Sequence, residues 1–163
     1  MSHNTELAAT DELLMSSTVT VEITDGPDKL VTLPTESTAV AMGMHDELAG
    51  FYGAPKGYIP HASTLDYVIG AAGACLAGTF KRALAARGIK PAKEDLATRA
   101  IGDIVAKDGV PVIRRIRVEY VLGGVDEADR ATVERVLAVH HRGCAVSRSL
   151  EGPIEIETTL TVR

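Results

Sequence analysis

The sequence predicts an α+β fold. Three observations predict it: stretches in which apolar and polar residues alternate, two segments of helical periodicity, and the order of these segments. Strand patterns come first, followed by a long helix, two strands, a second helix and a final strand, an order typical of the α+β class. The chain has 163 residues, 45% of them apolar, which suits one domain or one protomer of a modest oligomer.

The N-terminal part is expected to hold a flexible leader, residues 1–16, and then a group of strands. Residues 17–163 are expected to form a single domain. Val19, Val21 and Ile23 alternate with polar residues, which indicates a half-buried strand over residues 17–24. A turn sequence, Asp25-Gly26-Pro27-Asp28, leads to a return strand at 30–33. A weaker third strand covers 37–42, and a stretch rich in Gly and Pro, 50–61, is predicted to be a loop.

A long helix is predicted from Ser63 or Thr64, either of which is able to cap it, to about Ala86, with Gly88 as its stop. Its middle, residues 70–78, consists almost entirely of Ala and Gly. Each glycine costs a helix about 1 kcal/mol relative to Ala. Tertiary packing must offset that cost, so this segment is predicted to be the central buried helix, with small faces that let other backbones approach.

The remaining elements are two strands, a helix, a short turn and a last strand. The strands are expected at 97–105 and 113–122, joined by a turn at Lys107-Asp108-Gly109. Asp126 is expected to cap the second helix and Gly143 to end it. Residues 144–150 read as one helical turn, and 154–162 alternates as a final strand.

Composition argues against several classes of function. The net charge is −5 and the basic residues form no dense cluster, so nucleic acid is not an expected partner. No signal peptide is visible, and the most apolar stretch, 65–80, is shorter than the roughly 20 residues that a membrane span needs. We therefore expect a cytoplasmic protein with no membrane partner.

The two cysteines, Cys75 and Cys144, are the best candidates for chemistry. Thiols stay reduced in the cytoplasm, so the pair reads as inert core residues or as a redox pair rather than as a structural disulfide. Cys144 opens a short helical turn, where free N–H groups favour a thiolate. The alternative is that both are small buried hydrophobic residues, as free cysteines often are.

Two segments resemble motifs of the OsmC/Ohr family of bacterial stress-response proteins. Residues 71–76, Ala-Ala-Gly-Ala-Cys-Leu, are similar to the helix that holds that family's first cysteine. Residues 140–147, His-His-Arg-Gly-Cys-Ala-Val-Ser, are similar to its second motif, and the element order from 17 to 163 matches as well. The resemblance implies an OsmC-like fold, a strand-exchanged homodimer with a central buried helix between antiparallel sheets.

The resemblance also implies a function, the thiol-dependent reduction of organic hydroperoxides in the response to oxidative stress. Cys75 would attack the peroxide and Cys144 would resolve the sulfenic acid as a disulfide, which a thiol reductant then restores. A buried Cys75 with Cys144 close to it is expected on this reading. No cofactor and no metal are implied.

The chain departs from the family at three positions. It has no arginine before Arg82, whereas active members place one early to stabilise the thiolate and the peroxide. Leu65 stands ten residues before Cys75, where the family has Glu, with Asp66 one step away, and Ala145 replaces the usual proline. These departures predict a Cys75 pKa that is lowered less than in active relatives, unless Lys56, His45 or His61 replaces the missing cation.

Alternative functions follow from the same departures. A catalytically weak or inactive OsmC-like dimer would bind a small apolar ligand in its interface pocket. A further alternative is thiol chemistry of another kind, such as reversible storage of an electrophile. His140 lies on the apolar stripe of the second helix and is expected to be a hydrogen-bonded core residue rather than a metal ligand.

Overall fold

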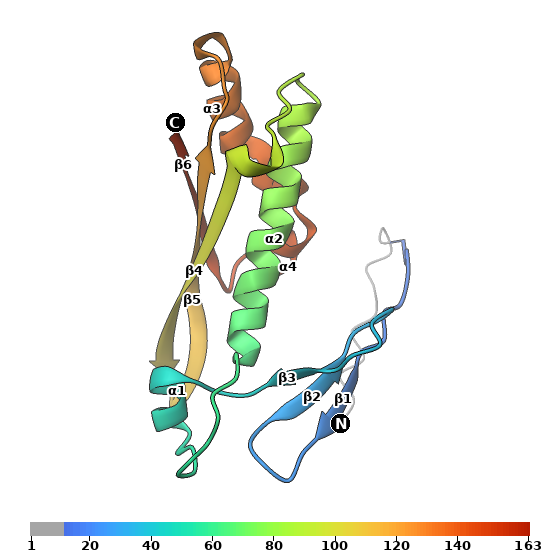
Figure 1. The fold of residues 1–163 in the computed structure, drawn as a ribbon, viewed down its shortest axis with the longest axis vertical. Coiled ribbons are helices and arrows are strands. Elements are labelled where there is room, and N and C mark those ends of the chain that lie inside the picture. The colour runs from blue at the N-terminus through green and yellow to red at the C-terminus, as the bar shows by residue number, and fades with distance from the viewer. Residues whose placement is uncertain (1–11) are drawn as a thin grey trace. The chain divides into compact units, whose positions relative to one another are not determined.

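A computed structural model of the chain describes residues 12–163, so part of the expected leader, 1–11, lies outside the described residues. The chain divides into two compact units, one ending at Ala62 and the other spanning Ser63–Arg163. Figure 1 shows the first unit with the small sheet and the second with the long helix. The mixed content of strands and helices confirms the predicted α+β class.

The first unit holds three short strands and one short helix. Strands β1 (Thr20–Ile23), β2 (Lys29–Thr32) and β3 (Val40–Met42) form an antiparallel sheet in the order β1-β2-β3. The three predicted strands are present: β1 and β3 are shorter than expected, and β2 has the expected length but begins one residue earlier. Helix α1 (Asp46–Phe51) was not predicted, because six residues are too few to display a helical period.

Helix α2 (Thr64–Ala85) opens the second unit and agrees with the predicted helix. Ser63 caps it through a capping box: the Asp66 backbone N–H donates to Ser63 Oγ at 3.2 Å, and the Ser63 backbone N–H donates to Asp66 Oδ2 at 2.7 Å. Its 22 residues make α2, by length and composition, a candidate membrane span, longer than the apolar stretch suggested. In the described structure one third of its apolar window is buried.

One face of α2 is buried, rather than its whole circumference. That face presents Ile69, Ala72, Gly73, Leu76, Phe80 and Leu84. The opposite side, with Gly70, Ala74 and Gly78, is exposed in the single chain. The predicted close approach of another backbone occurs at Gly73, which faces Ala100 of strand β4.

The second unit's sheet consists of β4 (Leu96–Lys107), β5 (Val110–Leu122) and β6 (Glu155–Val162), in that order. Strands β4 and β5 form an antiparallel hairpin, but β6 pairs with β5 in parallel, with Arg115 opposite Glu155 and Leu122 opposite Val162. This sheet is therefore mixed, and the expectation of two antiparallel sheets is wrong. The helical segment between β5 and β6 carries the chain back along the sheet, so that both strands run in the same direction.

The second predicted helix is broken into three pieces. Asp126 precedes a 3-10 turn, η2 (Glu127–Asp129), without a capping side-chain hydrogen bond, and α3 (Arg130–Val139) follows that turn directly. A second 3-10 turn, η3 (His140–Gly143), then leads to α4 (Ala145–Leu150). Another turn, η1 (Lys93–Asp95), precedes β4. The core of this unit is formed by α2, β5 and α3, and its fully buried side chains include Leu76, Phe80, Leu84, Ile116, Val118, Leu122, Val133, Val136 and Cys144.

Candidate functional site

The structure brings the two cysteines together. Cys75 lies in the middle of α2, and Cys144 is the N-cap residue of α4. Both are free thiols, Cys144 is 0% exposed and Cys75 is partly exposed, so Cys75 is less buried than the sequence suggested. The Cys144 side chain lies close enough to Cys75 to lower the pKa of the Cys75 thiol by hydrogen bonding. Such an arrangement suits exchange between a thiol pair and a disulfide.

The surroundings of Cys75 favour its thiolate. The backbone N–H of Val146 forms a hydrogen bond with Cys75 and lowers its pKa most strongly. Burial opposes this effect, while the Cys144 thiol, the Ala145 N–H and the positive charge of Arg82 lower the pKa further. The pKa of Cys75 therefore lies below the ordinary value for a cysteine, which increases the fraction of the nucleophilic form.

Cys144 has the opposite character. Its Sγ accepts a hydrogen bond from the Ser147 backbone N–H at 3.5 Å, as expected of a residue that opens a helical turn. Burial nevertheless raises the pKa of the Cys144 thiol, and the neighbouring Cys75 raises it further. The thiolate predicted for the start of this turn is thus favoured at Cys75, on which the Val146 and Ala145 N–H groups of the turn act, and not at Cys144.

Two features that stabilise the Cys75 thiolate were not predicted from the sequence, the charge of Arg82 and the backbone N–H groups of Ala145 and Val146. Arg82 lies seven residues after Cys75, and residues seven apart lie on one face of a helix two turns from each other. That spacing was visible in the sequence. The N–H groups of Ala145 and Val146 carried no such signal, because a backbone donor reaches a distant thiol only through the fold.

Leu65 and Asp66 do not rebuild the family's glutamate. Leu65 is partly buried and lines an apolar groove. Asp66 Oδ2 accepts hydrogen bonds from both the Ser63 backbone N–H at 2.7 Å and the Ser63 hydroxyl at 2.5 Å. Its carboxylate is therefore committed to the start of α2, nine residues before Cys75.

His140 is a hydrogen-bonded core residue, as predicted. It is 3% exposed, and its Nδ1 lies 2.8 Å from the Leu137 carbonyl, which only accepts, so Nδ1 carries the proton. Its Nε2 then accepts from the Tyr120 hydroxyl at 2.9 Å. Burial lowers the pKa of His140, and Phe80 stacks on Tyr120 with ring centroids 4.6 Å apart. This aromatic cluster forms part of the core in which Cys144 is buried.

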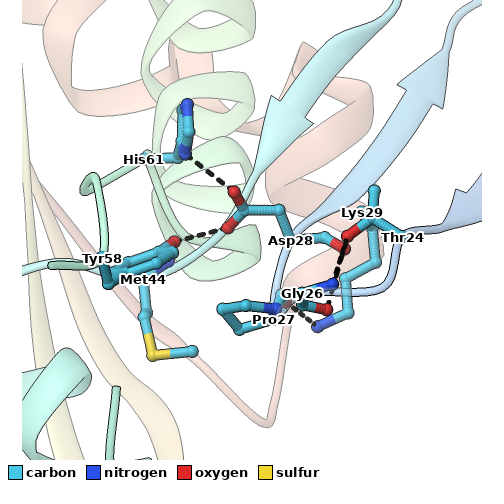
Figure 2. Close-up of polar contacts among 8 residues, drawn as sticks. All are labelled: Thr24, Gly26, Pro27, Asp28, Lys29, Met44, Tyr58 and His61. Atoms are coloured by element: carbon cyan, nitrogen blue, oxygen red, sulfur yellow. Dashed lines mark hydrogen bonds and ion pairs between the residues drawn. The ribbon is translucent and has the colours of Figure 1, made fainter. Parts of the chain in front are cut away.

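The first unit contains the other histidines that were considered as cations. His61 Nδ1 lies 3.0 Å from Asp28 Oδ2, which is within ion-pair distance. The His61 ring nitrogen is nevertheless not aligned for a hydrogen bond. The Tyr58 hydroxyl donates to Asp28 Oδ1 at 2.5 Å and accepts from the Met44 N–H at 3.0 Å. Figure 2 shows the Asp28 carboxylate in contact with both His61 and Tyr58. His45 contacts Asp46 at 2.8 Å, so both histidines have carboxylate neighbours within their own unit.

Two cavities of different character lie in the second unit. The first, about 470 Å³, is polar and includes His141, Arg142, Ser147, Arg148 and Glu151 in its lining. The second is an apolar groove of about 780 Å³ between the start of α2 and the β4–β5 hairpin. Its lining includes Leu65, Val68, Val105, Pro111, Ile113 and Leu150. Within residues 12–163, no cluster of three His, Cys, Asp or Glu side chains is arranged to hold a metal ion.

These observations define an α+β protein in which a cysteine on a long helix lies near a second cysteine and has its pKa lowered by the amides of a helical turn. A sequence model of the family described as OsmC-like protein matches residues 57–159. The chain belongs to the OsmC-like family. No match was found among curated proteins.

Solved structures agree with this assignment at the level of the fold. The OsmC-like protein of Mycoplasma pneumoniae superimposes with a TM-score of 0.70 at 14% identity, covering 92% of this chain and 99% of that one. The organic hydroperoxide resistance protein OsmC of Legionella pneumophila gives 0.70 at 14% identity, with 93% and 100% covered. The organic hydroperoxide resistance protein OhrB of Bacillus subtilis gives a TM-score of 0.64 at 15% identity, covering 91% of this chain and 100% of that one.

Proposed function

We propose that the protein is a cytoplasmic thiol peroxidase that reduces organic hydroperoxides during oxidative stress. The observation that carries the proposal is the pairing of a thiol whose pKa is lowered, Cys75, with a second thiol, Cys144, in hydrogen-bond contact with it. Two structural neighbours are named as organic hydroperoxide resistance proteins, and the family assignment supports the same chemistry.

The reaction begins at Cys75 because its thiolate is both favoured and partly exposed. The Cys75 sulfur attacks one oxygen of the hydroperoxide, an S–O bond forms, the O–O bond breaks, and the alkoxide leaves as an alcohol after taking a proton. Cys75 is then a sulfenic acid. Cys144 attacks this sulfur, an S–S bond forms and water leaves. Two equivalents of an external thiol return both residues to thiols.

The roles of the two cysteines follow from their environments. A sulfenic acid that is not resolved is oxidised irreversibly by further peroxide. Cys144 is fully buried and its pKa is raised, so it is itself protected from peroxide while lying next to Cys75. This asymmetry makes Cys75 the attacking thiol and Cys144 the resolving thiol.

The working form in this proposal is a homodimer with exchanged strands. Strand β1 is exposed along its whole length, with Val21 at 55% and Ile23 at 77% exposed. Apolar side chains gathered on one exposed segment indicate a surface that another chain covers. Light scattering of the purified protein tests this, and a stable monomer at micromolar concentration would contradict it.

A second candidate function is the binding of a small apolar ligand by a catalytically inactive protein. The apolar groove of about 780 Å³ favours it, because Leu65 lines that groove at the position where the family has a glutamate. The size lies in the range of small-molecule pockets. This candidate predicts ligand binding that does not depend on either cysteine.

The deciding experiment follows loss of an organic hydroperoxide in the presence of a dithiol. The wild-type protein, Cys75→Ser and Cys144→Ser are compared at equal concentration. We expect Cys75→Ser to be inactive and Cys144→Ser to lose activity progressively, as its Cys75 becomes overoxidised. Equal slow rates of hydroperoxide loss for all three proteins would reject the peroxidase function and favour the binding of a small apolar ligand.

A further inference from the structure

We propose that the polar cavity beside Cys144 binds the reductant, and that this reductant is a low-molecular-weight thiol carrying one or more carboxylate or phosphate groups. The inference rests on the proposed function, because it assigns the step that restores the thiols. It concerns residues that the peroxide chemistry does not use.

The cavity is of a size that holds one small molecule. Its volume is about 470 Å³, and its walls come from η3, α4 and the start of β6. His141, Arg142 and Arg148 bring basic side chains to it, whereas Glu151 is the one acidic residue in its lining. Ile154 and Ile156 add an apolar side that suits the carbon chain of a thiol.

The charge of this cavity differs from that of the whole protein. The chain has 22 acidic and 17 basic residues, yet residues 139–149 contain Arg142, Arg148 and two histidines and no acidic residue. Arg148 Nε lies 3.4 Å from Glu151 Oε2, which leaves its other N–H groups available. Arg142 makes no ion pair within residues 12–163. Guanidinium groups match carboxylate and phosphate oxygens, so an anion is the fitting ligand.

The cavity adjoins the resolving thiol through Ser147, the lining residue that contacts the sulfur of Cys144. Ser147 lines the cavity and is 8% exposed, and its backbone N–H donates to Cys144 Sγ at 3.5 Å. A thiol held by the arginines therefore lies on the other side of Ser147 from the sulfur that it must reach. Because Cys144 is 0% exposed in the reduced chain, the attack requires the short α4 turn to open.

The chemistry of the step favours attack on Cys144. A reductant thiolate attacks Cys144 Sγ, a new S–S bond forms, the bond between Cys75 and Cys144 breaks, and Cys75 leaves as a thiolate. A thiol with a lower pKa leaves faster, and the hydrogen bonds at Cys75 lower its pKa. A second thiolate attacks the sulfur of the bound reductant, the two reductant molecules leave as their disulfide, and Cys144 takes a proton from water.

The test measures the reduction step without any peroxide. The protein is oxidised with diamide, which joins two thiols as a disulfide, and then reduced with 3-mercaptopropionate, 2-mercaptoethanol or cysteamine, which are anionic, neutral and cationic. Rates are divided by the thiolate fraction of each reagent and corrected for thiolate basicity. We expect 3-mercaptopropionate to exceed 2-mercaptoethanol by about tenfold at low salt, a preference that salt reduces.

Variants assign the preference to the cavity. Arg142→Gln and Arg148→Gln should each lower the anionic-to-neutral ratio by about three- to fivefold, the effect of an exposed ion pair. Arg87→Gln changes the net charge equally at an exposed arginine far along the chain, whose guanidinium donates to the Ala83 carbonyl at 2.9 Å, and should leave the ratio unchanged. The anionic-to-neutral ratio compares two rates of the same variant. A variant that is merely less stable would lower both rates and leave this ratio unchanged. Phosphopantetheine represents the thiols that carry a phosphate group. Its rate, compared with that of 3-mercaptopropionate, distinguishes a preference for phosphate from one for carboxylate.

The site of attack gives a second readout. Mixed disulfides trapped by acid quenching and mapped by mass spectrometry should carry the reductant on Cys144. No preference for the anionic thiol, a preference that survives both arginine variants, or an adduct on Cys75 would each overturn the inference. A protein that diamide oxidises and that shows the preference, but that does not consume hydroperoxide, would support the inference and reject the peroxidase. Failure of diamide to form the disulfide would reject both.

Discussion

A Cβ atom built on Gly73 would lie 2.7 Å from the Cβ of Ala100, closer than two carbon atoms approach without displacement. Gly73 is on the buried face of α2 and Ala100 is on β4. The helix that carries Cys75 therefore packs directly on the sheet at a position two residues before the thiol. The glycine that weakens the helix is the one that fixes its distance from β4.

Gly73→Ala should destabilise the protein by about 1–3 kcal/mol, the usual cost of an added methyl group in a packed core. Thermal or urea unfolding measures it. Gly70→Ala is the matched control in the same helix, because nothing lies within 4 Å of its Cβ position. There the gain in helix propensity, up to about 1 kcal/mol, has no clash to oppose it. Equal destabilisation by both variants would contradict the packing described for Gly73.

Cys75 should react with iodoacetamide at a pH below that of an ordinary cysteine, since its pKa is lowered chiefly by the Val146 N–H and further by the Cys144 thiol. Cys144→Ala removes one donor and should raise the apparent pKa of Cys75. Cys144→Ser keeps a hydroxyl donor and should raise it less. The measurement is the rate of alkylation against pH, and a Cys75 that titrates like a free cysteine in the wild-type protein would show that these hydrogen bonds are ineffective.

Stability should fall as pH is lowered through the unfolded-state value of histidine, about 6.5, because burial lowers the pKa of His140 in the folded protein. Between the two values the unfolded chain binds the extra proton, so acid favours unfolding, and the contribution is fully present above the unfolded value. His140→Gln should remove this part of the pH dependence at some cost in stability. His141→Gln, at an exposed neighbour, should retain it, and unfolding curves from pH 5 to 8 compare the two.

Asp66→Ala should cost about 1 kcal/mol of stability through loss of the capping box of α2. Ser63→Ala should cost a similar amount, because it breaks the same pair of hydrogen bonds. If Asp66 instead replaced the family's glutamate in catalysis, its substitution would lower peroxide turnover far more than Ser63→Ala does. Unfolding free energies and turnover rates measured on both variants distinguish these roles.

Tyr58→Phe should loosen the first unit, because the hydroxyl joins Asp28 to the Met44 N–H. Loss of one such hydrogen bond costs about 1 kcal/mol. Faster limited proteolysis in the loop after α1 is the expected result. Tyr52→Phe is the control, since Tyr52 is 57% exposed and makes no side-chain hydrogen bond within residues 12–163. Identical digestion of Tyr58→Phe and wild type would indicate that Asp28 holds the loop through His61 alone.

Local patterns in the sequence accounted for most of the elements and for the identity of the candidate site. Alternation located the strands, the Ser63 cap and Gly88 bounded α2, and the two cysteine motifs indicated the family. These signals depend only on a residue and its neighbours in the chain, so they can be recognised from the sequence alone. Helix α1 was not predicted because its six residues are too few to show a helical period of apolar residues.

Only the tertiary structure decided how the two thiols differ. The sequence placed Cys144 at the start of a helical turn and Cys75 among small residues, which suggested that the turn would activate Cys144. In the fold the amides of Ala145 and Val146 lower the pKa of Cys75, while burial raises the pKa of Cys144. The direction of β6 was decided in the same way. Hydrogen bonds and burial between residues about 70 positions apart depend on packing, because no local pattern specifies which groups meet in space.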